Sequence, residues 1–475
     1  MQLVAYGAQD IYLTGNPQIT FFKVVYRRHT NFAMESIQQT FNGVSTFGKR
    51  STVIVSRNGD LINSAYINVI LPSLEKDLFT VTASAPNPVG PDPSYPSALF
   101  PSPTDELLDD TFELVWTNFV GLALIDYVTV EIGGQEIDKH YGLYMYLWQE
   151  LTMTSEKAQG YQRMVGGNDG GSGWLLIGNS EEPQLLTVPL DFWFNINAGL
   201  SLPLIALQYH EVRFIFQFSP LDNLVQVVTV RETIDTQGRK RPIGFILPKE
   251  EWSLTTTRLA TLQPTIDMFI DYIYLDTDER RRFAQMSHEY LIDQVQHNET
   301  TVDLQTADRL SQRLTFNHPC KELFWVFRRV DNVEANDVFN FSSFPAGEEK
   351  IGGDLMQFAV IRLNGHYRFN PARGPLFFRQ WQPFIHHTRI PDSNLYVYSF
   401  ALRPEEHQPS GTCNFSRIDN TILEYGLDTR AKYRSPVLPG VYRDRPTTGA
   451  LLNVFARNYN VLRIMSGMGG LAYSN

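Results

Sequence analysis

The sequence predicts an all-β protein made of two successive β-sandwiches, and three observations lead to this fold class. First, the ordered stretches are short and rich in β-branched and aromatic residues, as in AYINVIL, DYVTVEIG and HEVRFIFQF, which is typical of strands. Second, Gly, Asn, Asp and Pro separate these stretches, so many short strands alternate with turns. Third, the second half of the chain repeats motifs of the first half in the same order.

The elements between the strands are turns and a few helices. Glu131–Gln135 and Leu363–His366 carry glycine between two strand-like stretches, which predicts tight hairpin turns. Amphipathic helix is expected only at 141–157 and near 377–384, where apolar residues follow a helical period.

The repeat consists of weak matches that keep a common order. The separation is 254 residues at the first match (27 to 281) and 187 at the last (272 to 459). The matches are Arg27-Arg28 with Arg281-Arg282, Tyr66 with Glu322, Gly133 with Gly365, Trp148 with Trp381, Leu185 with Asn394, and Tyr272 with Tyr459.

The shrinking separation indicates that the first copy carries three extra segments, at 72–111, 160–185 and 220–264. We number the strands of an eight-stranded jelly roll B to I, with AYINVIL as D and DYVTVEIG as E. The extra segments then fall in the DE, FG and HI connections, which share one end of a jelly roll. Enlarged loops at one end predict a raised outer surface.

These observations divide the chain into an arm and two tandem eight-stranded jelly rolls with a few short helices in loops. The N-terminal arm is 1–26, the first jelly roll with its enlarged DE, FG and HI loops is 27–277, and the second is 278–475. We expect DYIYL (271–275) to be the last strand of the first sandwich.

Composition and charge exclude several function classes. Charged residues make up 19% of the chain, below the roughly 25% usual for soluble proteins, and interface centres are depleted of charge in this way. The net charge is −11, and Arg239-Lys240-Arg241 is a tight basic run beside Gly and Pro. Because phosphate binding needs clustered Lys and Arg, we expect no direct contact with nucleic acid.

The sequence also lacks the marks of secretion. The N-terminus has no basic start followed by an apolar run, as a signal peptide would, and the apolar stretch 114–125 is too short to cross a bilayer. Cys320 and Cys413 are the only cysteines, so free thiols in a reducing compartment are expected. The protein is therefore expected to be made in the cytoplasm without a membrane anchor.

No catalytic or cofactor-binding residue is predicted. The chain has no H-E-x-x-H, G-x-S-x-G or G-x-x-x-x-G-K-[ST] motif. His386-His387, with His407, is the nearest candidate for a metal site, but adjacent residues of a strand point to opposite faces. His318 with Cys320 offers only two ligands. We therefore expect no metal, and we interpret the charged run 403–407 as a structural or interface network.

Three N-x-[ST] sequons offer candidate glycosylation sites at Asn298, Asn340 and Asn414. Such triplets often arise by chance, and host-type glycosylation requires entry into the secretory pathway. We expect little use of them in a chain without a secretory signal.

Several long blocks resemble one known family. They include IGGQEIDKHYG, YIYLDTDERRRFAQMSHEYLI, YSFALRPEEHQPSGTCNFSRIDN and NYNVLRIMSGMGGLAYSN, and they are similar to major capsid proteins of the nucleocytoplasmic large DNA viruses. The resemblance implies a double jelly-roll capsid fold, a homotrimer that forms a pseudo-hexagonal capsomer, and an icosahedral shell of a double-stranded DNA virus. It also implies minor capsid and penton proteins as partners, and leaves open whether a viral membrane lies beneath the shell.

Two alternatives stay open at this point. A carbohydrate-binding β-sandwich protein would need an exposed aromatic platform, which the seven tryptophans allow. The segment Gly7–Ala33 is too apolar for a free tail; it packs beneath its own jelly roll, contacts minor capsid proteins, or does both.

Overall fold

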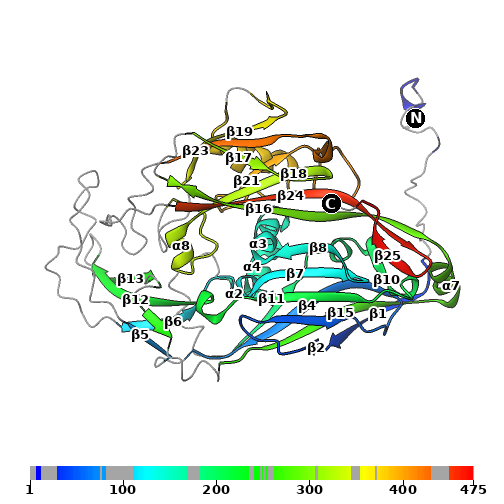
Figure 1. The fold of residues 1–475 in the computed structure, drawn as a ribbon, viewed down its shortest axis with the longest axis horizontal. Helices are drawn as coiled ribbons and strands as arrows, with labels where there is room; N and C mark the ends of the chain where they lie inside the picture. Colours follow the sequence, from blue (N-terminus) through cyan, green and yellow to red (C-terminus); the bar gives the residue numbers. More distant parts are fainter. Residues whose placement is uncertain are drawn as a thin grey trace, which may run out of the picture.

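The structure is a computed structural model in which most strands belong to two stacked sandwiches. Figure 1 shows the sheet of β16, β24 and β18 lying between the outer sheet of the second half and the elements α3 and β8 of the first half. The described residues are 7–11, 16, 29–74, 78–81, 111–167, 182–234, 240–246, 249, 252–254, 262–304, 309–343, 353–369, 372–428 and 449–473. The predicted arm at 1–26 and the Gly-rich stretch 166–173 therefore fall largely outside the described residues, and the Pro-rich stretch 86–103 does so entirely.

The first sandwich has the strand order of a jelly roll. One sheet follows the order B-I-D-G and the other C-H-E-F, and every pairing is antiparallel. The first sheet comprises β1 (Phe32–Gln39), β15 (Thr265–Leu275), β4 (Leu61–Leu71) and β9 (Gln184–Pro189), with β10 (Leu202–Pro203) also on β4. The second sheet comprises β2 (Phe41–Asn42), β3 (Arg50–Ile54), β11 (Val212–Phe218), β7 (Ile125–Ile132) and β8 (Gln135–Tyr141).

The second sandwich repeats this order. Its B-I-D-G sheet comprises β16 (His288–Asp303), β24 (Gly449–Met465), β18 (Pro319–Arg329) and β21 (Tyr396–Ser399), with β22 (Cys413–Asn414) on β18 and β25 (Met468–Leu471) on β24. Its C-H-E-F sheet comprises β17 (Leu310–Leu314), β23 (Thr421–Leu427), β19 (Met356–Leu363) and β20 (His366–Tyr367). DYIYL lies in β15 and pairs with β1 and β4. The predicted fold of two tandem jelly rolls is confirmed.

The E–F hairpins of the two sandwiches have the same turn. Gly133 and Gly134 have φ of 60° and 83°, and Asn364 and Gly365 have φ of 48° and 85°, as a type I′ turn requires. The turn positions pair Gly134 with Gly365. The sequence match of Gly133 with Gly365 is therefore shifted by one residue. The counterpart of Gly133 is Asn364, because Asn also tolerates the left-handed conformation at the first turn position.

The enlarged DE and HI connections are not simple loops, because they pair with each other. The DE segment contributes β5 (Phe79–Val81), β6 (Thr111–Trp116) and α2 (Val120–Leu124), and the HI segment contributes η6 (Leu221–Asn223), β12 (Val225–Ile234), β13 (Lys240–Ile246) and β14 (Trp252–Leu254). They form the sheets β13-β12-β6 and β14-β5, which lie beyond one end of the first sandwich (Figure 1). Mutual pairing satisfies the backbone hydrogen bonds of both segments.

Helices are short and stand in connections. The two helical regions predicted from sequence are present, as α3 (Gly142–Thr152) with α4 (Ser155–Met164), and as the π-helical η9 (Phe377–Trp381) with α9 (Gln382–His386). The others are α5 (Trp193–Ile196), η4 (Ala198–Leu200), η5 (Leu204–Ala206), α7 (Thr277–Gln285), α8 (Val330–Glu334) and η10 (Phe415–Arg417).

The apolar core of the first sandwich continues into the second. Side chains of β18 alternate between two cores: Leu323 and Trp325 pack inside the second sandwich, whereas Phe324 and Val326 belong to the core of the first. β18 is therefore buried on both faces, which explains why ELFWVF is a continuous apolar run rather than an alternating one.

Candidate functional site

The helix α3 joins the two sandwiches through aromatic side chains. The Tyr144 ring lies 5.9 Å from the rings of both Phe324 on β18 and Phe455 on β24, and the Tyr146 ring stacks 4.5 Å from Phe339. Arg457 of β24 places its guanidinium 3.5 Å from the centre of the Trp148 ring. Because these side chains are buried, the junction is a packed interface rather than a hinge.

Asn336 fixes the junction by hydrogen bonds. Its side-chain amide donates to the backbone carbonyl oxygens of Asp222 and Val225, both at 2.6 Å. The backbone carbonyl oxygen of Asn336 accepts from the side chains of Thr117 and Gln226. Its φ of 59° is one that Asn adopts more readily than other non-Gly residues. One residue of the second sandwich thus pairs with both the DE and the HI connections of the first.

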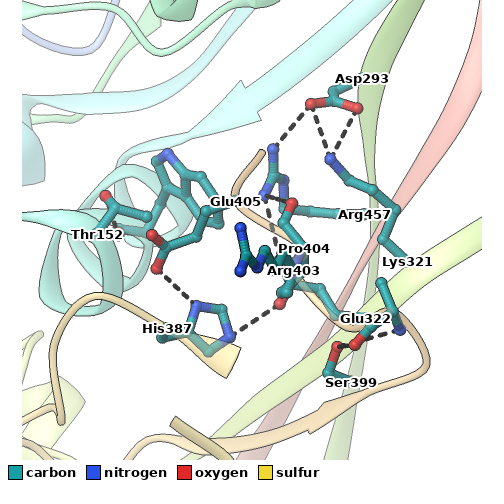
Figure 2. A network of polar contacts seen from close by, with 12 residues as sticks. Thr152, Asp293, Lys321, Glu322, His387, Ser399, Arg403, Pro404, Glu405 and Arg457 are labelled. Atoms are coloured by element: carbon teal, nitrogen blue, oxygen red, sulfur yellow. Dashed lines mark hydrogen bonds and ion pairs between the residues drawn. The ribbon is translucent and has the colours of Figure 1, made fainter. Parts of the chain in front are cut away.

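A network of charged side chains lies beside α3 (Figure 2). At its centre is Glu322 of β18, which is fully buried. One carboxylate oxygen of Glu322 accepts from Nη1 of Arg457 at 3.1 Å, and the other lies 3.0 Å from Nε2 of His387. His387 directly follows α9, so the centre joins three elements of the second sandwich.

The network is completed at both ends by further carboxylates. Asp293 of β16 accepts from Nη2 of Arg457 and from Nζ of Lys321, both at 3.0 Å. Glu405 lies 3.0 Å from Nδ1 of His387 and accepts from the backbone N–H of Thr388. Three carboxylates thus face three bases, and the set is neutral when His387 is protonated. The members are Asp293, Lys321, Glu322, His387, Glu405 and Arg457.

For His387 and Glu322, the charges of neighbouring side chains shift the pKa in the direction opposite to the effect of burial. Burial alone would lower the pKa of His387, but Glu322 and Glu405 raise it to about 9. Burial alone would raise the pKa of Glu322, but His387 and then Arg457 and Lys321 lower it to about 2. Burial lowers the pKa of Lys321 to about 8, with Arg457 acting in the same direction and Asp293 opposing it. At neutral pH, His387 is therefore an imidazolium bound to a carboxylate.

A second buried group lies on the side of the first sandwich. Nε2 of His140 is 2.9 Å from Asp138, whose other carboxylate oxygen accepts from the backbone N–H of Val295 on β16. Asp191 accepts from Nε2 of Gln149 on α3 at 2.7 Å, and burial raises the pKa of Asp191 to about 6. This group also ties the two sandwiches together.

The chemistry of the network is that of a closed ion cluster. Buried charges are tolerated where they are paired and hydrogen-bonded, and each base here faces a carboxylate. Within the described ranges, no group of three or more His, Cys, Asp or Glu side chains is arranged to hold a metal ion. The arrangement can hold β16, β18, β24 and the segment after α9 together within the second sandwich.

The structure brings only part of the predicted constellation into this network. His387 and Glu405 belong to it, whereas Nδ1 of the neighbouring His386 contacts the carbonyl oxygen of Leu402, and Arg403 pairs with Glu406 at the exposed surface. The two histidines engage different partners, and His386 ends α9 rather than lying on a strand as expected.

Asp293, Lys321 and Arg457 were not predicted. One signal stands in the sequence: the charged pair Lys321-Glu322 interrupts an otherwise apolar strand, and buried charges require partners. The identity of those partners follows only from strand register, because Glu322 is paired with Arg457 across β18 and β24.

The three sequons lie in different surroundings. Asn340 is 1% exposed, and its side chain is hydrogen-bonded to Asp337 and Ser342, so a glycan does not fit there. Asn298 is half-buried in β16. Asn414 is exposed, and its Oδ1 accepts from the backbone N–H of Ser416.

The cysteines and tryptophans complete the candidate residues. Cys320 and Cys413 are free thiols on opposed positions of β18 and β22. Among the described tryptophans, Trp381 alone is exposed, and its ring stacks with that of Phe384. None of the helices in that part of the chain is long and apolar enough to cross a membrane.

Comparison with known families matches both sandwiches. The family described as "Major capsid protein N-terminus" matches residues 20–276, and the family described as "Large eukaryotic DNA virus major capsid protein" matches residues 279–470. Among solved structures, PBCV-1 VP54 fitted into a reconstruction of the virophage Sputnik has a TM-score of 0.70 and 34% identity, covering 96% of this chain and 100% of that one. The Faustovirus major capsid protein shares the fold with a TM-score of 0.66 at 14% identity, over 97% of this chain and 94% of that one.

Relatives align over the whole length. The major capsid protein of Pyramimonas orientalis virus is 43% identical, and that of Paramecium bursaria Chlorella virus 1 is 38% identical, in each case over 100% of this chain and 99% of the relative. The double jelly-roll fold and these matches indicate the same family. The chain belongs to the major capsid proteins of large eukaryotic DNA viruses.

Proposed function

We propose that the chain assembles as a homotrimer that serves as a pseudo-hexagonal capsomer of the icosahedral shell. The observation that carries this proposal is the repetition of one sandwich within the chain, with the same B-I-D-G and C-H-E-F order in both copies. Three chains then supply six similar sandwiches around a closed threefold axis. A hexagonal outline built in this way fills a lattice position with a single gene product.

The two sandwiches of the chain differ in their connections, and this difference makes the outer surface of the capsomer uneven in height. Strands in the DE and HI connections form extra sheets only in the first sandwich, within the described residues. We infer that the first jelly roll, 27–277, carries the raised outer surface and that the second, 278–475, is lower. The capsomer is then hexagonal in outline and threefold in height.

The net charge and the charged network bear on the partners of the chain and on its lack of catalytic activity. The net charge of −11 argues against direct contact with the genome, so the partners are further copies of the chain and the minor capsid and penton proteins. We infer that the protein is made in the host cytoplasm. We also infer that it has no catalytic activity, because each base of the network lies within 3.1 Å of a carboxylate oxygen. Asn414 is the sequon best placed for a glycan, because its side chain is exposed.

Light scattering after size-exclusion chromatography tests the trimer. The expected mass is three times the 54.3 kDa of one chain, and negative-stain images should show hexagonal particles with three raised corners. A single-chain mass across the micromolar range would refute the proposal. Retention on a sugar column by a monomer would instead favour the carbohydrate-binding alternative.

A further inference from the structure

The B-I-D-G sheets of the two sandwiches are equivalent down to one irregularity. Each has a β-bulge between its I and D strands: Lys321 is left unpaired between β18 and β24, and Asn63 between β4 and β15. When the two bulges are aligned, the ring pair Phe324–Phe455 falls on the ring pair Tyr66–Phe269. Both pairs are stacked, with centroids 5.6 Å and 5.4 Å apart.

The two ring pairs differ in what covers them. Tyr144 of α3 lies over Phe324 and Phe455, and β18 and β24 are buried on both faces. On β4 and β15 burial alternates, because only one face packs into the core. The other face carries Tyr66 and Phe269 with an apolar pair beside them, Ile70 at 44% exposed and its cross-strand partner Leu185 at 68% exposed. We call these four residues the uncovered face.

The helices of the two FG connections are equivalent as well. Gln149 of α3 donates to Asp191 just after strand G, and Gln382 of α9 accepts from the backbone N–H of Ser399 at the end of strand G. Trp148 on α3 is 4% exposed because it packs on the second sandwich. Its sequence counterpart Trp381 is 53% exposed.

The exposed side of η9 and α9 is therefore an apolar surface without a partner in the described chain. Trp381 and Phe384 stack with centroids 6.3 Å apart, and Phe384 is 67% exposed. Leu376 and Ile385 are exposed beside them. We call these four residues the helix patch.

We propose that the helix patch of one copy packs on the uncovered face of the next copy, as α3 packs on Phe324 and Phe455 within the chain. The proposal rests on the trimer proposed above and assigns the residues that close it. One chain carries both halves of the contact on different sandwiches, so the contact is head-to-tail, and a rotation of one third of a turn closes it without leaving either half free. A partner of another kind would leave one apolar surface uncovered on every copy.

Two double variants separate the halves of the contact. Trp381→Ala with Phe384→Ala removes the helix patch, and Ile70→Asp with Leu185→Asp charges the uncovered face. Because aromatic anchors at interface centres dominate affinity, each change should weaken trimerisation by roughly 100-fold or more and give a monomer at micromolar concentration. Met286→Ala, which trims another exposed apolar side chain, is the matched control and should remain trimeric.

Mixing the two double variants tests the head-to-tail geometry. Each mixed pair retains one intact contact, between the helix patch of the face variant and the uncovered face of the helix variant. The expected product is a heterodimer with twice the mass of one chain and no larger species. A mixture that stays monomeric, or a helix variant that still forms trimers, would overturn the inference; the latter result leaves the trimer itself standing. A wild-type monomer would overturn both proposals.

A measurement on the wild type covers the case in which a variant fails to fold. The difference in fluorescence between the wild-type trimer and Trp381→Phe isolates the emission of Trp381. Emission at short wavelength that resists acrylamide quenching is expected for a ring covered by a neighbouring copy. Emission at the wavelength of a solvated indole would refute the contact.

Discussion

Replacing His387 by Gln should destabilise the protein in a way that fades as the pH rises. The pKa of His387 is about 9 in the folded chain, against the ordinary value of 6.5. At about 1.4 kcal/mol per pKa unit, the preference for the protonated form contributes roughly 3 kcal/mol to folding. Because the pKa of a base is raised, this contribution is complete below pH 6.5 and is lost as the pH rises through 9.

The comparison between wild type and variant isolates this effect. Lys321 acts in the opposite direction, since its pKa is lowered to about 8 and its deprotonation above that pH relieves the cost of burial. This contribution is present in both proteins and largely cancels in their difference. We therefore expect a gap in unfolding free energy of about 3 kcal/mol at pH 6 that shrinks to a small fraction of that value at pH 9.

Denaturant unfolding or scanning fluorimetry at pH 6, 7.5 and 9 would measure the gap. His386→Gln is the matched control, because Nδ1 of His386 contacts the carbonyl oxygen of Leu402 and the residue is not a member of the network. Its effect should be small. A His387→Gln gap that stays constant or widens toward pH 9 would show that the imidazolium–carboxylate pair with Glu322 does not stabilise the fold.

Substitutions at four further positions test other parts of the structure. Gly134→Ala and Gly365→Ala meet no atoms within 4 Å but impose a positive φ on Ala, so each should cost about 1–2 kcal/mol, measured as similar losses of unfolding free energy. Asn336→Ala should cost about 1 kcal/mol more than Asn336→Gly in the same assay, because both lose the hydrogen bonds to the first sandwich and only Ala is strained at φ 59°; equal losses would refute the backbone argument. Arg457→Met should cost about 3–5 kcal/mol, because it leaves buried Glu322 with one partner fewer, and a thermal melt unchanged from wild type would contradict this.

The fold was predictable because local and repeated signals agree. Short β-branched strands, glycine at the hairpin turns and a common order of motifs each point to tandem sandwiches, and none depends on distant contacts. The positions of the enlarged DE and HI connections also followed from the repeat. The pairing of these two connections with each other could not be predicted. More than a hundred residues separate β6 from β12, and the hydrophobic pattern of a strand does not identify the strand beside it.

The candidate site was predictable only in part for the same reason. His387 and Glu405 stand in conspicuous charged clusters, but Arg457 and Asp293 each lie between uncharged neighbours in long strands. Their meeting depends on the register of β24 against β16 and β18. A one-residue slip in that register would turn each side chain to the opposite face, so sequence alone could not place them.

The charged network has a further consequence for assembly, because the chain presents two equivalent sheets and two equivalent helices. Aligning the bulges places Arg457 at the position of Asp271 and Glu322 at that of Ser64, and these two residues of the first sandwich are hydrogen-bonded to each other. Trp148 on α3 covers Arg457 and gains a cation–π contact. The same helix on the first sandwich would meet the carboxylate of Asp271, which offers no such contact. Specificity arises from a difference between partners. The ion cluster thus favours α3 on its own chain and leaves the uncovered face to the helix patch of the next copy.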